Sequence, residues 1–178
     1  MREPSPGLDS IAVEASSPDR QIRARFAGAG DVEVRFAHGA YRRYTERDLG
    51  HQLAGLATLL WTGHRQEYLR RVGAASGTPA HRVSPRGKRA DFRNALADVA
   101  VEGVSPDRST TVRSVGLLRW EVVVSDGTVR RLAEQEFVAG LLAAVSATLA
   151  AYFAAAHRLK DEIFDLRLHE AYADSRWR

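Results

Sequence analysis

The stretch Val13-Glu14-Ala15-Ser16-Ser17-Pro18-Asp19-Arg20 recurs later in the chain as Val101-Glu102-Gly103-Val104-Ser105-Pro106-Asp107-Arg108, an offset of 88 residues. The same offset continues without a gap and gives 17 identities over the 61 positions from 12 to 72. Self-similarity at a fixed period is typical of a duplicated structural unit. The 178-residue chain is therefore predicted to contain two related halves.

Each half is predicted to begin with three short antiparallel strands. Pro18 and Asp19 favour a turn, because proline presets φ and aspartate can bond its own backbone. Residues 22–26 and 32–36 then alternate apolar with charged side chains, a period of two that indicates strands with one wet face. The second half repeats this pattern and adds a break at Asp126-Gly127.

A long helix is predicted to follow each set of strands. Thr45 and Asp48 form a pattern close to a capping box, and leucines at helical spacing continue to about Arg71. The second helix is expected to start near Ala133 and to reach about His169. Its residues 137–156 carry no charge and are rich in alanine, which predicts a buried or partner-covered helix rather than a membrane span.

The boundaries of the units follow from the turn-forming residues between them. The first unit is predicted to span 1–72, and residues 73–88, rich in Gly, Pro and Arg, to form a linker. The second unit spans 89–178 and includes an additional short helix over 89–99. The predicted fold class is α+β: two βββα repeats related by a pseudo-twofold axis, equivalent to a fused homodimer with a long C-terminal helix.

The Ser-Pro-Asp-Arg turn, the arginine-bearing strand, the Gly28-Ala29-Gly30 turn, the valine-rich strand and the long helix together resemble the YbaB/EbfC family, in particular its actinobacterial branch. The resemblance covers about 60 residues of the first copy and is weaker in the second. It implies a small α/β protein that binds DNA with little sequence preference and associates with the nucleoid. Some relatives instead accompany type VII (ESX) secretion machinery, which implies a protein-interaction module as the alternative.

The chain departs from that family in three features: the unit is duplicated, the first copy lacks a preceding helix, and the final helix is extended. A protein partner, or self-association, is expected through helix 133–168 if the alternative holds.

The net charge is +4, and the excess is concentrated between residues 76 and 98, with five basic and two acidic groups. Convergent cations can bind a phosphate backbone by releasing counterions. The candidate DNA-binding residues are Arg42, Arg43, Arg70, Arg71, Arg82, Arg86, Lys88, Arg89 and Arg93. A solvated basic loop is the alternative interpretation of the segment between the units, and Arg23, Arg25, Glu33 and Arg35 predict a mixed ionic face on the first sheet.

Motifs of catalysis are not found. The chain has no cysteine, so thiol chemistry and thiolate metal sites are excluded. No two histidines have the i, i+4 spacing of a helical metal site, and no P-loop or Gly-x-Ser-x-Gly motif occurs. We expect a cytoplasmic, non-enzymatic protein without a cofactor, a metal or a membrane span, in which Trp61 and Trp120 belong to the core.

Overall fold

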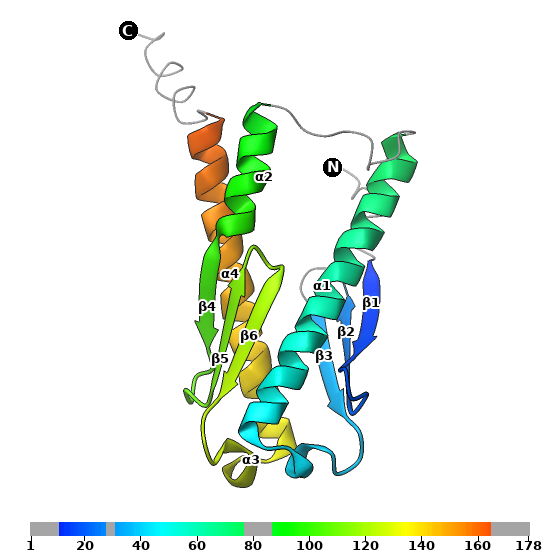
Figure 1. Ribbon diagram of the computed structural model, residues 1–178, viewed down its shortest axis with the longest axis vertical. Coiled ribbons are helices and arrows are strands. Elements are labelled where there is room, and N and C mark those ends of the chain that lie inside the picture. Colours follow the sequence, from blue (N-terminus) through cyan, green and yellow to red (C-terminus); the bar gives the residue numbers. More distant parts are fainter. Residues whose placement is uncertain (1–10, 28–30, 77–86, 165–178) are drawn as a thin grey trace, which may run out of the picture.

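The computed structural model describes residues 11–27, 31–76 and 87–164, and shows a mixed α+β fold (Figure 1). The strands and helices follow one another in this order: β1 (Ala12–Ser16), β2 (Ile22–Ala27), β3 (Asp31–Phe36), the 3-10 helix η1 (Tyr41–Arg43), α1 (Glu46–Ser76), α2 (Lys88–Asp98), β4 (Ala100–Val104), β5 (Thr110–Val115), β6 (Arg119–Val124), α3 (Thr128–Arg131) and α4 (Glu134–Ile163). The predicted fold class, α+β, is confirmed at this level.

The strands form two separate antiparallel sheets, ordered β1-β2-β3 and β4-β5-β6. Arg25 lies opposite Glu14 and Glu33 in the first sheet, and Arg113 lies opposite Glu102 and Glu121 in the second. The bounds of all six strands, and every one of these pairings, correspond at an offset of 88 residues. The predicted three-stranded meander is therefore present in each half.

The Ser-Pro-Asp-Arg segments form the turns that join the first two strands of each sheet. The hydroxyl of Ser17 donates to Asp19 Oδ1 at 2.6 Å and accepts from the Ile22 N–H at 2.9 Å. Ser105 makes the same two contacts, with Asp107 at 2.7 Å and with the Thr110 N–H at 3.0 Å. These bonds satisfy backbone groups that the turn removes from the sheet ladder.

Both turns place an arginine in the left-handed region. Arg20 has φ = 60° and Arg108 has φ = 59°. Each is the last residue of its Ser-Pro-Asp-Arg segment, and the paired strand begins two residues later. The repeated sequence thus specifies a repeated backbone conformation.

The two long helices cover the inner faces of the sheets and form the core with them. α1 packs on β1, β2 and also on β6 of the other sheet, and α4 packs on β4 and β5. α1 approaches β6 closely at Gly50, where an added Cβ would overlap the carbonyl oxygen of Val122. Leu49, Leu53 and Leu56 of α1 are buried there, each contributing roughly 2 kcal/mol from the removal of its side chain from water.

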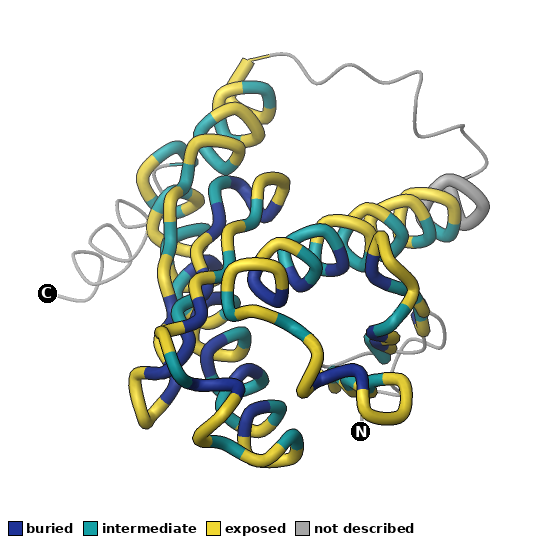
Figure 2. The backbone as a smooth tube through the Cα atoms, turned by 60° about the horizontal axis from the view of Figure 1, so that its bottom comes forward, coloured by how far each residue is buried: buried dark blue, intermediate teal, exposed yellow. Residues whose placement is uncertain are grey.

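Both long helices continue beyond the sheets and project from the same end of the molecule as two separated arms (Figure 1). One arm is the outer part of α1, and the other is the outer part of α4 with α2 packed against it. Phe92 of α2 contacts Phe164, just after α4, with ring centroids 5.8 Å apart. In Figure 2 buried residues gather where the helices cross the sheets, and exposed residues predominate toward the ends of α1 and α2.

Two predicted boundaries need correction. α1 continues to Ser76 rather than ending near Arg71, so residues 73–76 are helical and not linker. Lys88, placed in the linker, is the first residue of α2. The single Gly73 costs a helix only about 1 kcal/mol relative to alanine, which a helix of 31 residues tolerates. The remaining linker residues 77–86 and the predicted helix end near His169 lie outside the described residues.

Candidate nucleic-acid interface

The two arms carry a set of exposed cations that are not neutralised by ion pairs. Within residues 11–27, 31–76 and 87–164, no ion pair is found for the following exposed side chains: Arg65 on α1, Arg89 and Arg93 on α2, and Arg158 and Lys160 on α4. Arg89 and Arg93 are four residues apart and therefore share one face of α2. Exposed cations are therefore present on both arms.

Arg70 and Arg71, both predicted DNA contacts, lie on the α1 arm beside Glu67. Arg70 Nη2 lies 2.7 Å and Arg71 Nε 2.8 Å from Glu67 Oε1. The two guanidinium groups lower the pKa of Glu67 to about 2, so this carboxylate stays ionised and offsets one of the two positive charges. Ion pairs at a protein surface contribute little to stability.

The predicted residues do not form one patch. Lys88, Arg89 and Arg93 lie on α2, across the space between the arms from Arg70 and Arg71. Arg82 and Arg86 lie outside the described residues. Arg42 and Arg43 belong to η1, which packs against α3 at the end of the molecule opposite the arms.

Arg42 has a structural role in this arrangement. Its Nη1 donates to the carbonyl oxygens of Val129 at 2.5 Å and of Arg130 at 3.0 Å, at the end of α3. The guanidinium carbon also lies 5.7 Å from the centre of the Tyr41 ring. Sequence reasoning missed this function because the acceptors are backbone groups 87 and 88 residues away.

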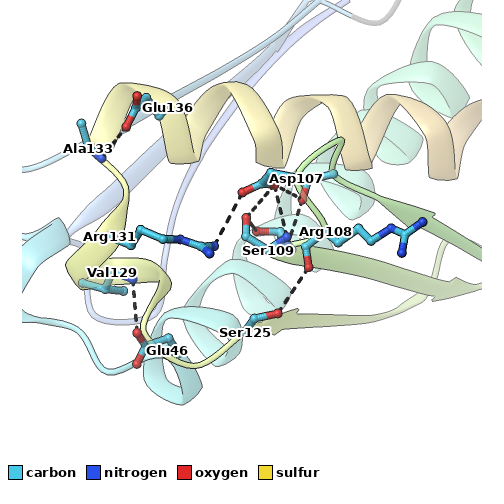
Figure 3. Close-up of polar contacts among 11 residues, drawn as sticks. Glu46, Asp107, Arg108, Ser109, Ser125, Val129, Arg131, Ala133 and Glu136 are labelled. Carbon is cyan, nitrogen blue, oxygen red and sulfur yellow. Dashed lines mark hydrogen bonds and ion pairs between the residues drawn. The ribbon is translucent and has the colours of Figure 1, made fainter.

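The contacts around Asp107 and α3, shown in Figure 3, tie the second Ser-Pro-Asp-Arg turn to its surroundings. Asp107 Oδ1 accepts from the Ser105 and Ser109 hydroxyls and from the Ser109 N–H, and Asp107 Oδ2 lies 4.0 Å from Arg131. The hydrogen bond from Ser105 is the largest influence on this carboxyl; with the bonds from Ser109 it outweighs burial and lowers the pKa of Asp107.

The equivalent turn in the first half has a similar effect on Asp19. Burial, the largest influence, raises the pKa of this carboxyl, but hydrogen bonds from Ser17, Tyr44 and the Gln21 N–H together lower it below its usual value. Both aspartates are therefore structural acceptors in turns, and neither is placed as a catalytic acid.

The outer faces of the sheets are mixed ionic surfaces, as the sequence predicts for the first one. Arg25 lies 3.9 Å from Glu14, and Arg35 lies 3.3 Å from Glu33. On the second sheet Arg113 bridges Glu102 at 2.6 Å and Glu121 at 3.3 Å. These paired charges make the sheets poorer phosphate-binding surfaces than the arms.

Sequence reasoning overlooked Arg65, Arg158 and Lys160 because the charge was summed over segments of the chain. Residues 99–178 contain slightly more acidic than basic groups, which conceals the exposed cations of the outer part of α4. The available signal was the length of the two helices: a helix of 30 residues is about 45 Å long and must extend beyond a six-residue strand.

A second surface feature is the outward side of α4. This side has small or apolar exposed residues from the first turn to the last charged turn: Ala139, Ser146, Ala147, Ala150, Phe153 and Ala154. By length and composition α4 could cross a membrane, but its opposite side, with Phe137, Leu141 and Tyr152, is buried in the protein.

Among the described residues, no group of three or more His, Asp or Glu side chains is arranged to hold a metal ion. Compared with family models, with curated proteins and with solved structures, the chain has no significant match.

Proposed function

We propose that this chain is a tandem duplication of a YbaB/EbfC-like βββα unit, whose two copies are related by a pseudo-twofold axis as in a fused homodimer. The proposal is supported by local structural features that occur in both halves. Strand bounds, strand registers, turn hydrogen bonds and the left-handed arginines of the two halves all correspond at the 88-residue offset. α1 of the first half packs on β6 of the second, so the two halves share one core.

We propose further that the protein is a non-enzymatic, cytoplasmic binding protein without a cofactor, which associates with the nucleoid by contacting the DNA backbone without sequence preference. The observation that carries this proposal is the pair of arms with unpaired cations on each. Arginine suits phosphate contacts because its planar fork presents several donors. A contact made only to phosphates positions a protein on duplex DNA and carries no sequence information.

The arms are a better candidate than the base of the molecule. Arg42 at the base is already used as a donor to the end of α3. Arg89 and Arg93 are exposed on a helix and have no ion pair within the described part of the chain. We therefore propose the arms as the DNA-binding surface, in preference to Arg42 and Arg43 at the base.

The experiment is a titration of fluorescently labelled random-sequence duplex at low salt with the full chain and two double variants. Arg89→Glu with Arg93→Glu should abolish binding, because the α2 face then repels phosphate. Arg23→Glu with Arg35→Glu is the matched control: it changes the net charge equally, on the outer face of the first sheet. An equal loss of duplex affinity in the two variants would show that only the net charge matters, and would reject the arms as the interface.

A second candidate function is a protein-interaction or accessory module of a type VII secretion system. The outward side of α4 favours it, because residues 139–154 on that side offer no charge to solvent and small side chains permit close helix contact. Ala147→Glu introduces a charge in the centre of that side. The second candidate is supported if this substitution abolishes binding of a secretion-system partner, or abolishes self-association in sedimentation experiments. It is rejected if the wild-type chain is monomeric and captures the same proteins as the variant.

A further inference from the structure

A half-open cavity of about 80 Å³ lies where the two halves meet, lined by β2, β3 and α1 of one half and by β5, β6 and α4 of the other. Its lining is nearly symmetric in sequence position. Ala24 and Val112, Val34 and Val122, and Ala57 and Val145 are pairs of lining residues at the 88-residue offset. The cavity is therefore a feature of the junction and not of either half alone.

The walls of the cavity are apolar except at one point. Aromatic rings come from Phe26, Trp61 and Trp120, and aliphatic side chains supply most of the rest. His64 is the only ionisable lining residue among the described residues. The volume exceeds the share of one water molecule, about 30 Å³, but a buried water needs two to four polar partners. A closed apolar cavity of about 150 Å³, larger than this one, stays dry and takes up benzene or xenon.

His64 is held in place by two rings. It packs edge-on against Phe26 with centroids 4.8 Å apart, and it stacks on Trp61 with centroids 5.6 Å apart. Burial lowers the pKa of this imidazole, so the ring is neutral at pH 7 and offers one donor and one acceptor nitrogen. Within the described residues no hydrogen bond uses either nitrogen.

We propose that this cavity is a binding site for a small uncharged molecule with a ring-sized apolar body and one hydrogen-bonding group, which meets His64. The apolar body replaces empty space beside Phe26, Trp61 and Trp120 and gains dispersion contacts. A charged molecule of the same size is rejected, because the cavity has no group that compensates its desolvation. The site is independent of the cations on the arms, so the two proposals can fail separately.

The first test fills the cavity from α1. Benzene and phenol are titrated against the full chain, and binding is followed by the fluorescence of Trp61 and Trp120 and by protein NMR shifts. Ala57→Leu should weaken both ligands at least tenfold, and Ala57→Val, which copies Val145, should give a smaller loss if the leucine variant does not fold. Thr62→Leu, on the exposed side of α1 and outside the cavity lining, is the control and should bind as the wild type does.

The second test addresses the polar contact. His64→Leu should retain benzene binding and lose the preference for phenol over benzene that the wild type shows. Benzoate and benzylammonium should not bind to any form.

Three results would each overturn the proposal. The folded wild type would show no saturable binding of neutral rings, Ala57→Leu would bind them as tightly as the wild type, or the charged rings would bind as tightly as the neutral ones. A concentration-dependent dimer that Ala57→Leu abolishes would also overturn it, because the cavity would then receive a side chain of a second copy.

Discussion

The guanidinium of Arg42 donates to the carbonyl oxygens of Val129 and Arg130, and so joins the segment before the first long helix to the segment before the second. Glu46, at the start of α1, accepts from the Val129 N–H at 3.2 Å (Figure 3) and completes the link in the opposite direction. A charged donor and a charged acceptor from one half therefore satisfy backbone groups of the other half at the base of the molecule.

Arg42→Ala is predicted to lower the free energy of unfolding by about 1–2 kcal/mol, because two carbonyl groups at the end of α3 lose a charged donor. Arg43→Ala is the control: among the described residues the Arg43 guanidinium hydrogen-bonds only to Gln21 Oε1, at 3.3 Å, so its loss should change stability by less than about 0.5 kcal/mol. Urea unfolding followed by circular dichroism measures both. Equal effects of the two substitutions would show that the bond to α3 contributes nothing.

Acid should weaken the protein through Asp19 and Asp107. Both carboxyl groups have folded-state pKa values below their usual value. Their contribution to stability is therefore complete above the unfolded pKa of about 3.9 and is lost as the pH falls through the folded value. Asp107→Asn should be less stable than the wild type at pH 7, and the difference should shrink below about pH 4. A difference that stays constant from pH 7 to pH 3 would contradict the assignment of Asp107 as an ionised acceptor.

Gly103 in β4 allows α4 to approach the second sheet. An added Cβ would overlap the carbonyl oxygen of Ala144 and lie 2.5 Å from the Thr148 hydroxyl oxygen. Gly103→Ala is predicted to cost about 1–3 kcal/mol, the usual range for overpacking a well-packed contact. Gly140→Ala is the matched change on α4: its Cβ would lie 3.5 Å from the nearest atom, so the higher helix propensity of alanine should leave stability equal or raise it by up to about 1 kcal/mol. Thermal unfolding that ranks the two variants in the opposite order would refute this packing.

Tyr41 and Tyr44 provide a test of hydrogen-bond satisfaction. The buried hydroxyl of Tyr41 has no hydrogen-bond partner among the described residues, whereas the hydroxyl of Tyr44 donates to Asp19 Oδ2 at 2.5 Å. Tyr41→Phe should therefore be neutral or stabilising, because an unsatisfied buried polar group is removed. Tyr44→Phe should be destabilising by about 1 kcal/mol, because a hydrogen bond is lost. Denaturant midpoints measure both variants. If Tyr41→Phe is the more destabilising of the two, the Tyr41 hydroxyl has a hydrogen-bond partner in solution.

The local structure was largely predictable from the sequence. The alternation of residues 22–26, the turn at Ser17-Pro18-Asp19 and the cap at Thr45 are short-range patterns, and the structure shows strand, turn and helix start where these patterns occur. The Asp48 N–H donates to the Thr45 hydroxyl at 3.2 Å, as the predicted cap requires. Such signals are readable because the interacting groups are within a few residues of each other.

The arrangement of the long helices was not predictable in the same way. Gly73 was interpreted as the start of the linker, although α1 continues through it to Ser76. The structural use of Arg42 depends on carbonyl groups from the other half, and the cavity beside Trp61 and Trp120 depends on how closely the halves approach. These properties arise from three-dimensional packing, and neither periodicity nor charge counting contains them.

The salt dependence of duplex binding tests the central claim most directly. The prediction counts the five arm cations without an ion pair among the described residues: Arg65, Arg89, Arg93, Arg158 and Lys160. If each of them contacts a phosphate, log K should fall against log salt with a slope of about −4.5, so that affinity decreases roughly 500-fold between 50 and 200 mM salt. Arg89→Gln with Arg93→Gln should reduce the magnitude of this slope by about 2, since two phosphate contacts are removed. A flat slope for the wild type, or an unchanged slope for the double variant, would contradict DNA-backbone binding by the arms.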